Sequence, residues 1–562
     1  MNTKKVGFLL LAHLSLGLVT VNMRATVVST SYGISRQVNV NASGQNIPGD
    51  AANEPSICID PNNPLRMAIG WRQFDTTNSN FRQSGVAYTT NGGLNWTFPG
   101  NLEVGTFRSD PVLASDANGV FYYLGISNSS TFACDLLRST NGGATWQPVG
   151  PALRGDKEWM AIDTTSSPGR DNIYQVWSPF YNLYNNQNQV FTRSTDGGNN
   201  WMPAIYLPHL PYWGTIAIGP NGEVYNFGTA IDIVPFWINR SRAHPDTAAM
   251  ENLVFTPVGS KRLVIKGITC LAALAGFALA AVSRCAHRSS DATNRLTTPT
   301  IDVSTAVDLG GPPVIGLPGI NPDGLLGQAW VAVDCSTGPT RGNVYVLCSV
   351  TNEPGNLVNV MFSRSIDGGR TWSVPLRIND DSPTQNAVHW FGTLSVAPNG
   401  RVDACWNDPR HSANHNLSEL YYSWSDDGGL TWAVNRPLSL PFNQSLGYPQ
   451  QNKMGDYIGM VSLNEGACIA YTATFNGEED IYLVRAELPI NATIAPVGNV
   501  ARITWNSTLG ANYCVQAIVD LSLPWASGTI VACMTATGSS TSVDDPLAGS
   551  NGRRYYRVIR EP

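Results

Sequence analysis

The sequence predicts an all-β fold built from repeated modules of four short strands. An eight-residue phrase recurs five times along the chain, as TTNGGLNW (89–96), STNGGATW (139–146), STDGGNNW (194–201), SIDGGRTW (365–372) and SDDGGLTW (425–432). The chain is rich in Gly, with 53 residues, and only 14% of its residues are charged. This composition is typical of many short strands joined by tight turns.

Each part of the phrase has a structural role in a strand–turn–strand unit. The Asp or Asn side chain can accept backbone N–H groups within a tight turn. The two glycines supply the positive φ angles that other residues adopt only at a cost. The Trp then buries a large ring at the start of the next strand. We therefore expect a hairpin at each copy.

The phrase resembles the Asp-box, or BNR repeat, of sialidases and related β-propellers. The resemblance implies that each copy connects the third and fourth strands of a propeller blade. It also implies that the boxes lie on one face of the propeller and that an active site lies on the opposite face. The fold resemblance covers about residues 50–488, but the Phe/Tyr-Arg-Ile-Pro signature of sialidases is absent.

The spacing of the boxes predicts the number of blades. The third residues of the boxes are at positions 91, 141, 196, 367 and 427, so one blade takes about 55 residues and the long gap has room for two blades without a box. Seven apolar segments have the character of innermost strands: 54–61, 109–116, 157–164, 212–220, 328–335, 389–398 and 456–463. We therefore predict seven blades, with the six blades of sialidases as the family alternative.

The ends of the chain predict export and ring closure. Lys4 and Lys5 precede an apolar run, which indicates a signal peptide over residues 1–25. Residues 26–488 are assigned to the propeller. Within it, segment 35–46 resembles 376–386, and we expect it to supply the missing strand of the last blade. The protein is therefore expected to be secreted, periplasmic or on the cell surface.

Two further segments depart from the blade pattern. Residues 260–297 are apolar with basic flanks, and we expect an insert there rather than a membrane span, because blades on both sides must join one ring. Contact with a membrane is expected only if this insert or an uncleaved N-terminus enters it. Residues 490–562 resemble a small fibronectin type III-like β-sandwich.

Charge and cysteine content narrow the possible partners. The net charge is −6, which argues against nucleic acid as a partner. The ten Cys residues lack metal-ligand spacing, so no metal or cofactor is expected. Cys335–Cys348 and Cys514–Cys533 are plausible local disulfides in an exported protein, whereas Cys58, Cys405 and Cys468 are expected to be free.

Candidate site residues lie in the loops opposite the boxes. The resemblance implies arginines that clamp a substrate carboxylate, a Tyr nucleophile with an activating carboxylate, and an Asp acid. The catalytic candidates are Tyr457, Glu158, Asp75 and Asp110. The substrate-binding candidates are Arg72, Arg108, Arg410, Trp177, Tyr181 and Asp408.

These residues also have structural interpretations that stay open. Arg108 with Asp110, and Arg410 with Asp408, could instead tie neighbouring blades together, and Tyr457 could be a packing residue. The favoured function is exo-hydrolysis of a terminal acidic sugar on a glycan. One alternative is another glycosidase or a lyase that uses a carboxylate pair such as Asp110 and Glu158. The other is a non-catalytic propeller that binds glycans or proteins.

Overall fold

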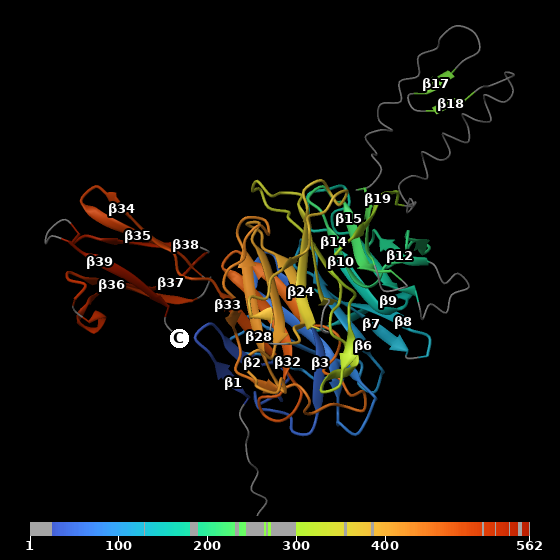
Figure 1. The fold of residues 1–562 in the computed structure, drawn as a ribbon, viewed down its shortest axis with the longest axis horizontal. Helices are drawn as coiled ribbons and strands as arrows, with labels where there is room; N and C mark the ends of the chain where they lie inside the picture. Colours follow the sequence, from blue (N-terminus) through green and yellow to red (C-terminus); the bar gives the residue numbers. More distant parts are fainter. Residues whose placement is uncertain are drawn as a thin grey trace, which may run out of the picture.

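The structure, a computed structural model, is an all-β protein made of small antiparallel sheets (Figure 1). It describes residues 25–560 except for 129, 180–188, 231–234, 243–262, 266–267, 271–298, 353–356, 384–386, 508–510, 523, 539 and 549–552. Within these residues there is no α-helix, and every pair of strands is antiparallel. The predicted signal peptide, 1–25, lies outside the described residues apart from residue 25 itself.

Seven of the sheets follow one another along the chain, and each begins with a strand that packs against the first strand of the next sheet. The first three are β3 (Ala51–Asp60), β4 (Asn63–Phe74) and β5 (Gln83–Thr89); β6 (Ser109–Ser115), β7 (Phe121–Asn128), β8 (Ala133–Ser139) and β9 (Gln147–Arg154); and β10 (Asp156–Ile162), β11 (Ile173–Ser178), β12 (Gln189–Ser194) and β13 (Ile205–Tyr206). The fourth is β14 (Tyr212–Ile218), β15 (Val224–Thr229), β16 (Phe236–Ser241) and β19 (Ile301–Val307).

The last three sheets complete the ring. They are β22 (Trp330–Val333), β23 (Val344–Asn352), β24 (Leu357–Ser365) and β25 (Leu376–Arg377); β26 (Trp390–Val396), β27 (Val402–Asp408), β28 (Leu417–Ser425), β29 (Arg436–Pro437) and β30 (Phe442–Asn443); and β31 (Gly459–Leu463), β32 (Gly466–Ala473), β33 (Asp480–Glu487), β2 (Ile34–Gln37) and β1 (Val27–Ser29). Each first strand begins within or beside one of the seven apolar segments identified in the sequence.

The N-terminal strand closes the ring, as the sequence predicted. β2 pairs with β33, with Ser35 opposite Val484 and Gln37 opposite Tyr482. β31, the first strand of this last sheet, packs against β3 of the first sheet. The arrangement is a β-propeller in which strands from both ends of the ring share one sheet, so the edge of β33 is covered.

One expectation about the long gap between boxes is wrong. Only one boxless sheet, β14–β15–β16–β19, lies between the third and fourth boxes, not two. The extra length is taken up by residues 242–300, between β16 and β19, and by a separate hairpin of β20 (Ile315–Leu317) and β21 (Ile320–Leu325). The distance between boxes in the sequence does not distinguish inserted residues from a second blade without a box.

The five boxes share one hydrogen-bond pattern. In the fourth box, Ser365 Oγ donates to Asp367 Oδ1 at 2.8 Å, and Gly369 N donates to Ser365 Oγ at 2.8 Å. Thr371 N also donates to Asp367 Oδ1, at 2.9 Å. The same three bonds recur in the other four boxes. Each box starts at the last residue of a third strand, which confirms the predicted hairpins.

The shared pattern makes the box carboxylate a stability element. Replacing Asp367 with Ala should remove the acceptor of these bonds and lower the free energy of unfolding by about 1–2 kcal/mol. Ile366→Ala is the matched control, because Ile366 lies in the same hairpin with 72% of its surface exposed. Chemical denaturation of both variants measures the difference, and equal stability would contradict the role assigned to the box.

The insert enters the fourth sheet between its third and fourth strands, the position that a box occupies in five other sheets. Ser241 at the end of β16 lies opposite Ile301 at the start of β19. Most of the predicted insert, 260–297, lies outside the described residues; the backbone of β17 (Leu263–Ile265) and β18 (Ile268–Cys270) is described and stands away from the ring in Figure 1. Within the described part of the chain, no helix is long and apolar enough to cross a membrane.

The register across this connection predicts that the ring does not need the insert. Replacing residues 243–299 with Asn-Gly should leave a soluble protein. The two flanking residues are already joined across the hairpin, because Arg242 N donates to Thr300 O at 3.3 Å. The melting temperature should stay within a few degrees of the parent. A second deletion that also removes Val303 should unfold the sheet, because it shifts β19 by one residue. Insolubility of the first variant would contradict the prediction.

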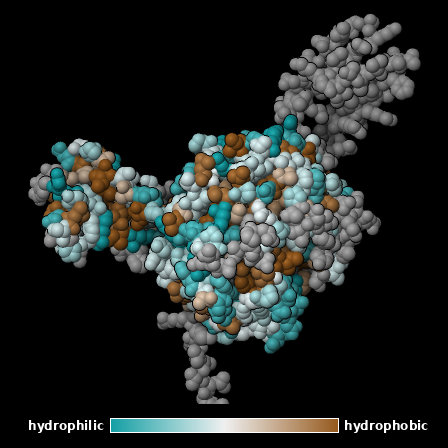
Figure 2. Space-filling model, viewed as in Figure 1, coloured by the Kyte–Doolittle hydropathy of each residue, from teal (hydrophilic) through white to brown (hydrophobic). Residues whose placement is uncertain are grey.

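The C-terminal module contains two three-stranded sheets. They are β34 (Ala492–Val497), β35 (Val500–Asn506) and β38 (Ser540–Asp545), and β37 (Thr529–Thr535), β36 (Asn512–Ile518) and β39 (Tyr555–Arg560). A 3-10 turn, η3, spans Trp525–Ser527. Ile503, Trp505, Tyr513 and Val515 are among the buried residues of its own core. The module forms a lobe beside the ring, with apolar patches visible on its surface in Figure 2.

The cysteines match the predictions with one exception. Cys514 and Cys533 form a disulfide between β36 and β37, as predicted. Cys58, Cys405 and Cys468 are free and buried, also as predicted. The predicted Cys335–Cys348 bond is wrong. Val333 at the end of β22 pairs with Val344 at the start of β23, so the two cysteines lie toward opposite ends of this strand pair.

Candidate functional site

A group of charged side chains meets where the innermost strands begin, on the face opposite the five box hairpins. We call Glu54, Arg72, Asp110, Lys157, Lys453 and Asp456 the central ionic cluster. Glu54, Asp110 and Lys157 lie in the first few residues of β3, β6 and β10, and Arg72 lies on β4 opposite Asn53. Lys453 and Asp456 lie in the segment that leads into β31.

The cluster is held together by ion pairs between sheets. Lys157 Nζ lies 3.1 Å from Asp110 Oδ2 and also contacts the carboxylate of Asp456. Lys453 Nζ lies 2.7 Å from Asp456 Oδ2 and 3.5 Å from Glu54 Oε1. These contacts join the first, second, third and seventh sheets at the axis of the ring.

Arg72 adds a cation to the cluster, and one nitrogen of its guanidinium group has no hydrogen-bond partner among the described residues. Its Nε lies 3.1 Å from Glu54 Oε2, and its Nη1 donates to Gln451 Oε1 at 2.9 Å. Its Nη2 is buried and has no hydrogen-bond partner among the described residues. Leaving a buried guanidinium nitrogen without a hydrogen bond is energetically costly.

The backbone at this site is strained in a repeated way. Glu54, Asp110 and Lys157 have φ angles of 54°, 52° and 54°, in the left-handed region that non-glycine residues rarely adopt. The register of each innermost strand shifts at the same place, as a β-bulge does. Such conformations cost about 1–3 kcal/mol each and persist where the surrounding structure fixes them. The bulges turn all three charged side chains into the cluster.

The cluster pushes the pKa values of neighbouring carboxyl groups in opposite directions. Burial raises the pKa of Glu54 to about 7, against the opposing effect of Arg72. Burial disfavours ionisation of Asp110 and Asp456, but the combined charges of Lys157, Lys453 and Arg72 outweigh it and hold the pKa of both below the ordinary range. Near neutral pH the site therefore contains two carboxylates beside a carboxyl group that can hold a proton.

Two loops cover the cluster. Asn321 of β21 donates from Nδ2 to Gly455 O at 2.8 Å, and Leu325 N donates to Asp456 Oδ1 at 2.8 Å. The hairpin β20–β21 therefore packs on the segment that carries Lys453 and Asp456. Lys157 and Lys453 keep 10% and 11% of their side chains exposed, so the cluster reaches the surface through its lysines.

Two of the predicted catalytic residues lie close to the cluster. Tyr457 follows Asp456, and its hydroxyl donates to Pro111 O at 3.0 Å. Burial raises its pKa well above the ordinary value, which disfavours a phenolate, and its ring packs edge-on against Trp159. Glu158 is buried with neither carboxylate oxygen hydrogen-bonded to a described residue, and burial raises its pKa well above the ordinary value.

The three predicted arginines lie in three separate sets of ion pairs. Arg108 pairs with Glu103 and, at 2.8 Å, with Asp135. Arg410 pairs with Asp408 at 2.8 Å and with Asp380 at 2.6 Å. Neither shares a carboxylate partner with Arg72 among the described residues. The Arg410 contacts join the sixth sheet to the segment that precedes it, as the structural interpretation expected.

The remaining predicted residues lie outside the cluster. Asp75 is exposed just after β4 and accepts from Gln83 Nε2 at 3.1 Å. Trp177 is buried in β11, where its Nε1 has no hydrogen-bond partner among the described residues. Tyr181 falls outside the described residues.

Sequence reasoning placed Glu54, Lys157 and Asp456 on this face without giving them a role, and it did not select Lys453. Three of these four share a signal that was present in the sequence: Glu54, Lys157 and Asp456 are each the first residue of an apolar segment, and Asp110 is the second residue of another. Lys453 had no such signal, because only the path of the segment before β31 brings it beside Glu54 and Asp456.

Comparisons with known proteins add no family assignment. No protein-family model matches the chain. Among solved structures, the chain is similar to a fungal alcohol oxidase, with 12% identity, coverage of 94% of this chain and 92% of that chain, and a TM-score of 0.44. It is also similar to a lectin from Burkholderia pseudomallei, with 12% identity, coverage of 74% and 94%, and a TM-score of 0.41.

A third similarity is to an α-L-arabinanase from Penicillium chrysogenum, with 10% identity, coverage of 82% of this chain and 98% of that chain, and a TM-score of 0.35. These similarities are too low to assign a shared activity. The function must therefore be argued from the residues of this chain.

The buried carboxyl group of Asp50 predicts that stability falls as the pH rises. Burial raises the pKa of Asp50 to about 7, so the folded chain keeps a proton that the unfolded chain loses near pH 4. Between these values the folded state binds more protons, and raising the pH therefore favours unfolding. The melting temperature should fall between pH 5 and pH 8.

Asp50→Asn should flatten this dependence and raise stability at pH 8 by about 1–4 kcal/mol relative to the parent. Asp426→Asn is the control, because it removes the same charge from an exposed position. Thermal melts at several pH values measure the effect. A parent protein whose stability rises over this range would contradict the assignment.

Proposed function

We propose that this protein is an exported glycan-acting enzyme that cleaves next to an acidic sugar at the central ionic cluster. The observation that carries the proposal is the combination of a proton-holding carboxyl group, Glu54, with the carboxylates of Asp110 and Asp456 and three cations on one face of the ring. Glycoside cleavage needs an acid and a carboxylate whose pKa values differ.

Each member of the cluster has a role in the proposed reaction. Glu54, with a pKa of about 7, donates a proton to the leaving oxygen. Asp110 is the carboxylate that takes a proton from the attacking water, whose oxygen bonds to the anomeric carbon as the glycosidic bond breaks. Arg72 offers its unpaired Nη2 to the carboxylate of the acidic sugar, and Lys157 and Lys453 balance the added negative charge.

The proposed chemistry differs from the Tyr-dependent scheme that the sialidase resemblance implied. The hydroxyl of Tyr457 is engaged by Pro111 and its pKa is raised, which supports a packing role. Glu158 is a second proton-holding carboxyl group near Asp110, so the carboxylate-pair alternative remains with either glutamate as the acid.

The finer features of the architecture belong to the same proposal. The ring is proposed as a seven-bladed Asp-box propeller, supported by the seven sheets and the five boxes with one bonding pattern. The C-terminal module is proposed as a fibronectin type III-like spacer, supported by its two three-stranded sheets. Export is proposed from the N-terminal sequence pattern.

Activity measurements on acidic glycans test the function. Fluorogenic sialosides and uronides, followed by a screen of acidic polysaccharides for new chain ends, should identify a substrate. Glu54→Gln and Asp110→Asn should each lower kcat/KM by about 10²–10⁴-fold, because a general acid or an assisting carboxylate contributes on this scale. Asp426→Asn, on the box face, should leave the rate unchanged. Circular dichroism establishes that each variant is folded.

The pH profile separates the two candidate acids. With Glu54 as the acid, activity should fall as the pH rises through about 7, because the deprotonated group cannot donate. This fall in activity at high pH should be absent from the Glu54→Gln variant and present in the Glu158→Gln variant. Binding of acidic glycans without cleavage would favour the non-catalytic alternative. No binding and no cleavage of any acidic glycan would exclude the proposal.

A further inference from the structure

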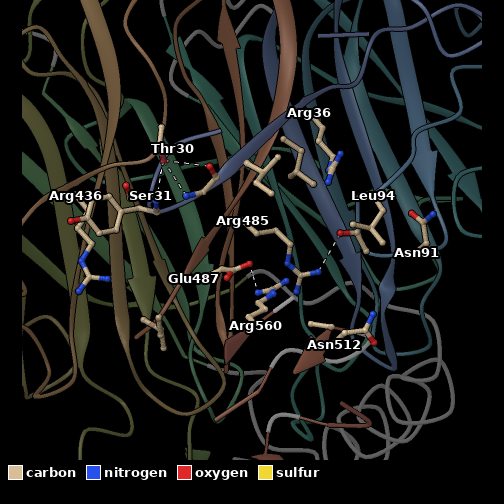
Figure 3. A pocket seen from close by; sticks show the side chains of 18 of the residues that line it. Thr30, Ser31, Arg36, Asn91, Leu94, Arg436, Arg485, Glu487, Asn512 and Arg560 are labelled. Carbon is tan, nitrogen blue, oxygen red and sulfur yellow. Dashed lines mark hydrogen bonds and ion pairs between the residues drawn. The ribbon is translucent and has the colours of Figure 1, made fainter. Parts of the chain in front are cut away.

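A second site lies far from the central ionic cluster, between the ring and the C-terminal module. A pocket of about 510 Å³ is lined by β2, the first Asp-box, β33 and residues of β36 and β39 (Figure 3). Its volume is within the range of small-ligand sites. The first box faces it through Gly92, Gly93 and Leu94, so it lies on the box side of the ring.

The pocket is strongly basic in an acidic protein. Four arginines line it, Arg36, Arg436, Arg485 and Arg560, and the one acidic lining residue is Glu487. The whole chain has 41 acidic and 35 basic residues, so this concentration of arginine is not a reflection of its composition. Figure 3 shows Arg485 and Arg560 in the middle of the view, with Arg36 above them to the right and Arg436 at the left.

Two of these arginines have no carboxylate to neutralise them. Among the described residues, the guanidinium of Arg36 makes no hydrogen bond or ion pair. Arg436 lies over the rings of Tyr32, at 5.3 Å, and Trp424, at 4.7 Å, and likewise has no ion pair with a described residue. By contrast, Arg560 pairs with Glu487, and Arg485 lies 3.6 Å from Glu465. Arg36 and Arg436 are therefore available to a ligand.

The chemistry of the lining points to an acidic sugar. Guanidinium groups bind carboxylate and sulfate oxygens in paired hydrogen bonds. Tyr32, with 43% of its surface exposed, offers an aromatic face beside Arg436, and Leu94 offers apolar surface. Thr30, Ser31, Asn91 and Asn512 add neutral hydrogen-bonding groups. This mixture of cations, an aromatic ring and small polar groups suits a carboxylated or sulfated oligosaccharide.

We propose that this pocket is a binding site for an acidic oligosaccharide, separate from the central ionic cluster. Because its walls come from both the ring and the C-terminal module, a bound chain contacts both. Binding there holds the protein on an acidic polysaccharide without occupying the face where cleavage is proposed. The inference stands whether or not the central cluster is catalytic.

Titration calorimetry on the full chain at low salt tests the site. The probes are galacturonic acid oligomers, which carry carboxylates, heparin-derived oligomers, which carry sulfates, and neutral maltooligosaccharides. We expect binding of at least one acidic probe and none of the neutral one. The acidic probe that binds identifies the anion, and added salt should weaken its binding.

Matched double variants locate the binding. Arg36→Ala with Arg436→Ala should weaken binding by at least tenfold without loss of folding, since neither arginine has an ion pair with a described residue. Arg138→Ala with Arg370→Ala removes the same charge from exposed positions on other sheets and should change the affinity less than twofold. Three results would overturn the proposal. They are an equal loss of affinity in both double variants, binding of the neutral probe as tight as that of the acidic probes, and no binding of either acidic probe.

Discussion

The pairing of β2 with β33 is the constraint on which the rest of the structure depends. A series of twisted sheets leaves an unpaired edge at each end, and here the two ends meet in one sheet because the N-terminal strand is hydrogen-bonded beside the last ring strand. Closure brings β31 against β3. Without it, Lys453 and Asp456 from the end of the ring could not lie beside Glu54 and Arg72 from its beginning.

The central ionic cluster therefore depends on closure as well as on local geometry. Its side chains converge because strained residues at the starts of β3, β6 and β10 turn them toward the axis. The cost of that strain, and of burying charge, is offset by ion pairs between sheets that lie far apart in the sequence. A buried charged network of this kind stabilises little by itself, so its arrangement is better explained by use at the site.

The two faces of the ring divide local hydrogen bonding from contacts that only the folded ring brings together. On one face, five boxes repeat a single bonding pattern that depends only on local sequence. On the opposite face, charged residues from several sheets meet through contacts between segments far apart in the sequence, and the β20–β21 hairpin and the segment before β31 complete the cluster. The basic pocket departs from this division, because it combines the first box with a separate module.

The repeats and the patterned strands were predictable because their causes are local. A Ser or Thr, an Asp or Asn and two glycines close each of the five box hairpins, and short apolar segments mark the innermost strands. The sequence alone therefore determined the all-β architecture, the hairpins and the closing strand. Of the two disulfides that it made plausible, only Cys514–Cys533 forms, because these residues lie opposite each other on paired strands.

Tertiary structure decided what local sequence could not. The box spacing counted residues 242–300 as part of a blade, because length does not reveal that Ser241 pairs with Ile301. The three arginines looked equivalent in sequence, but each pairs with whichever carboxylates the folded ring places beside it. The carboxylate that pairs with each arginine is set by distances between residues of the folded ring, and the sequence does not contain those distances.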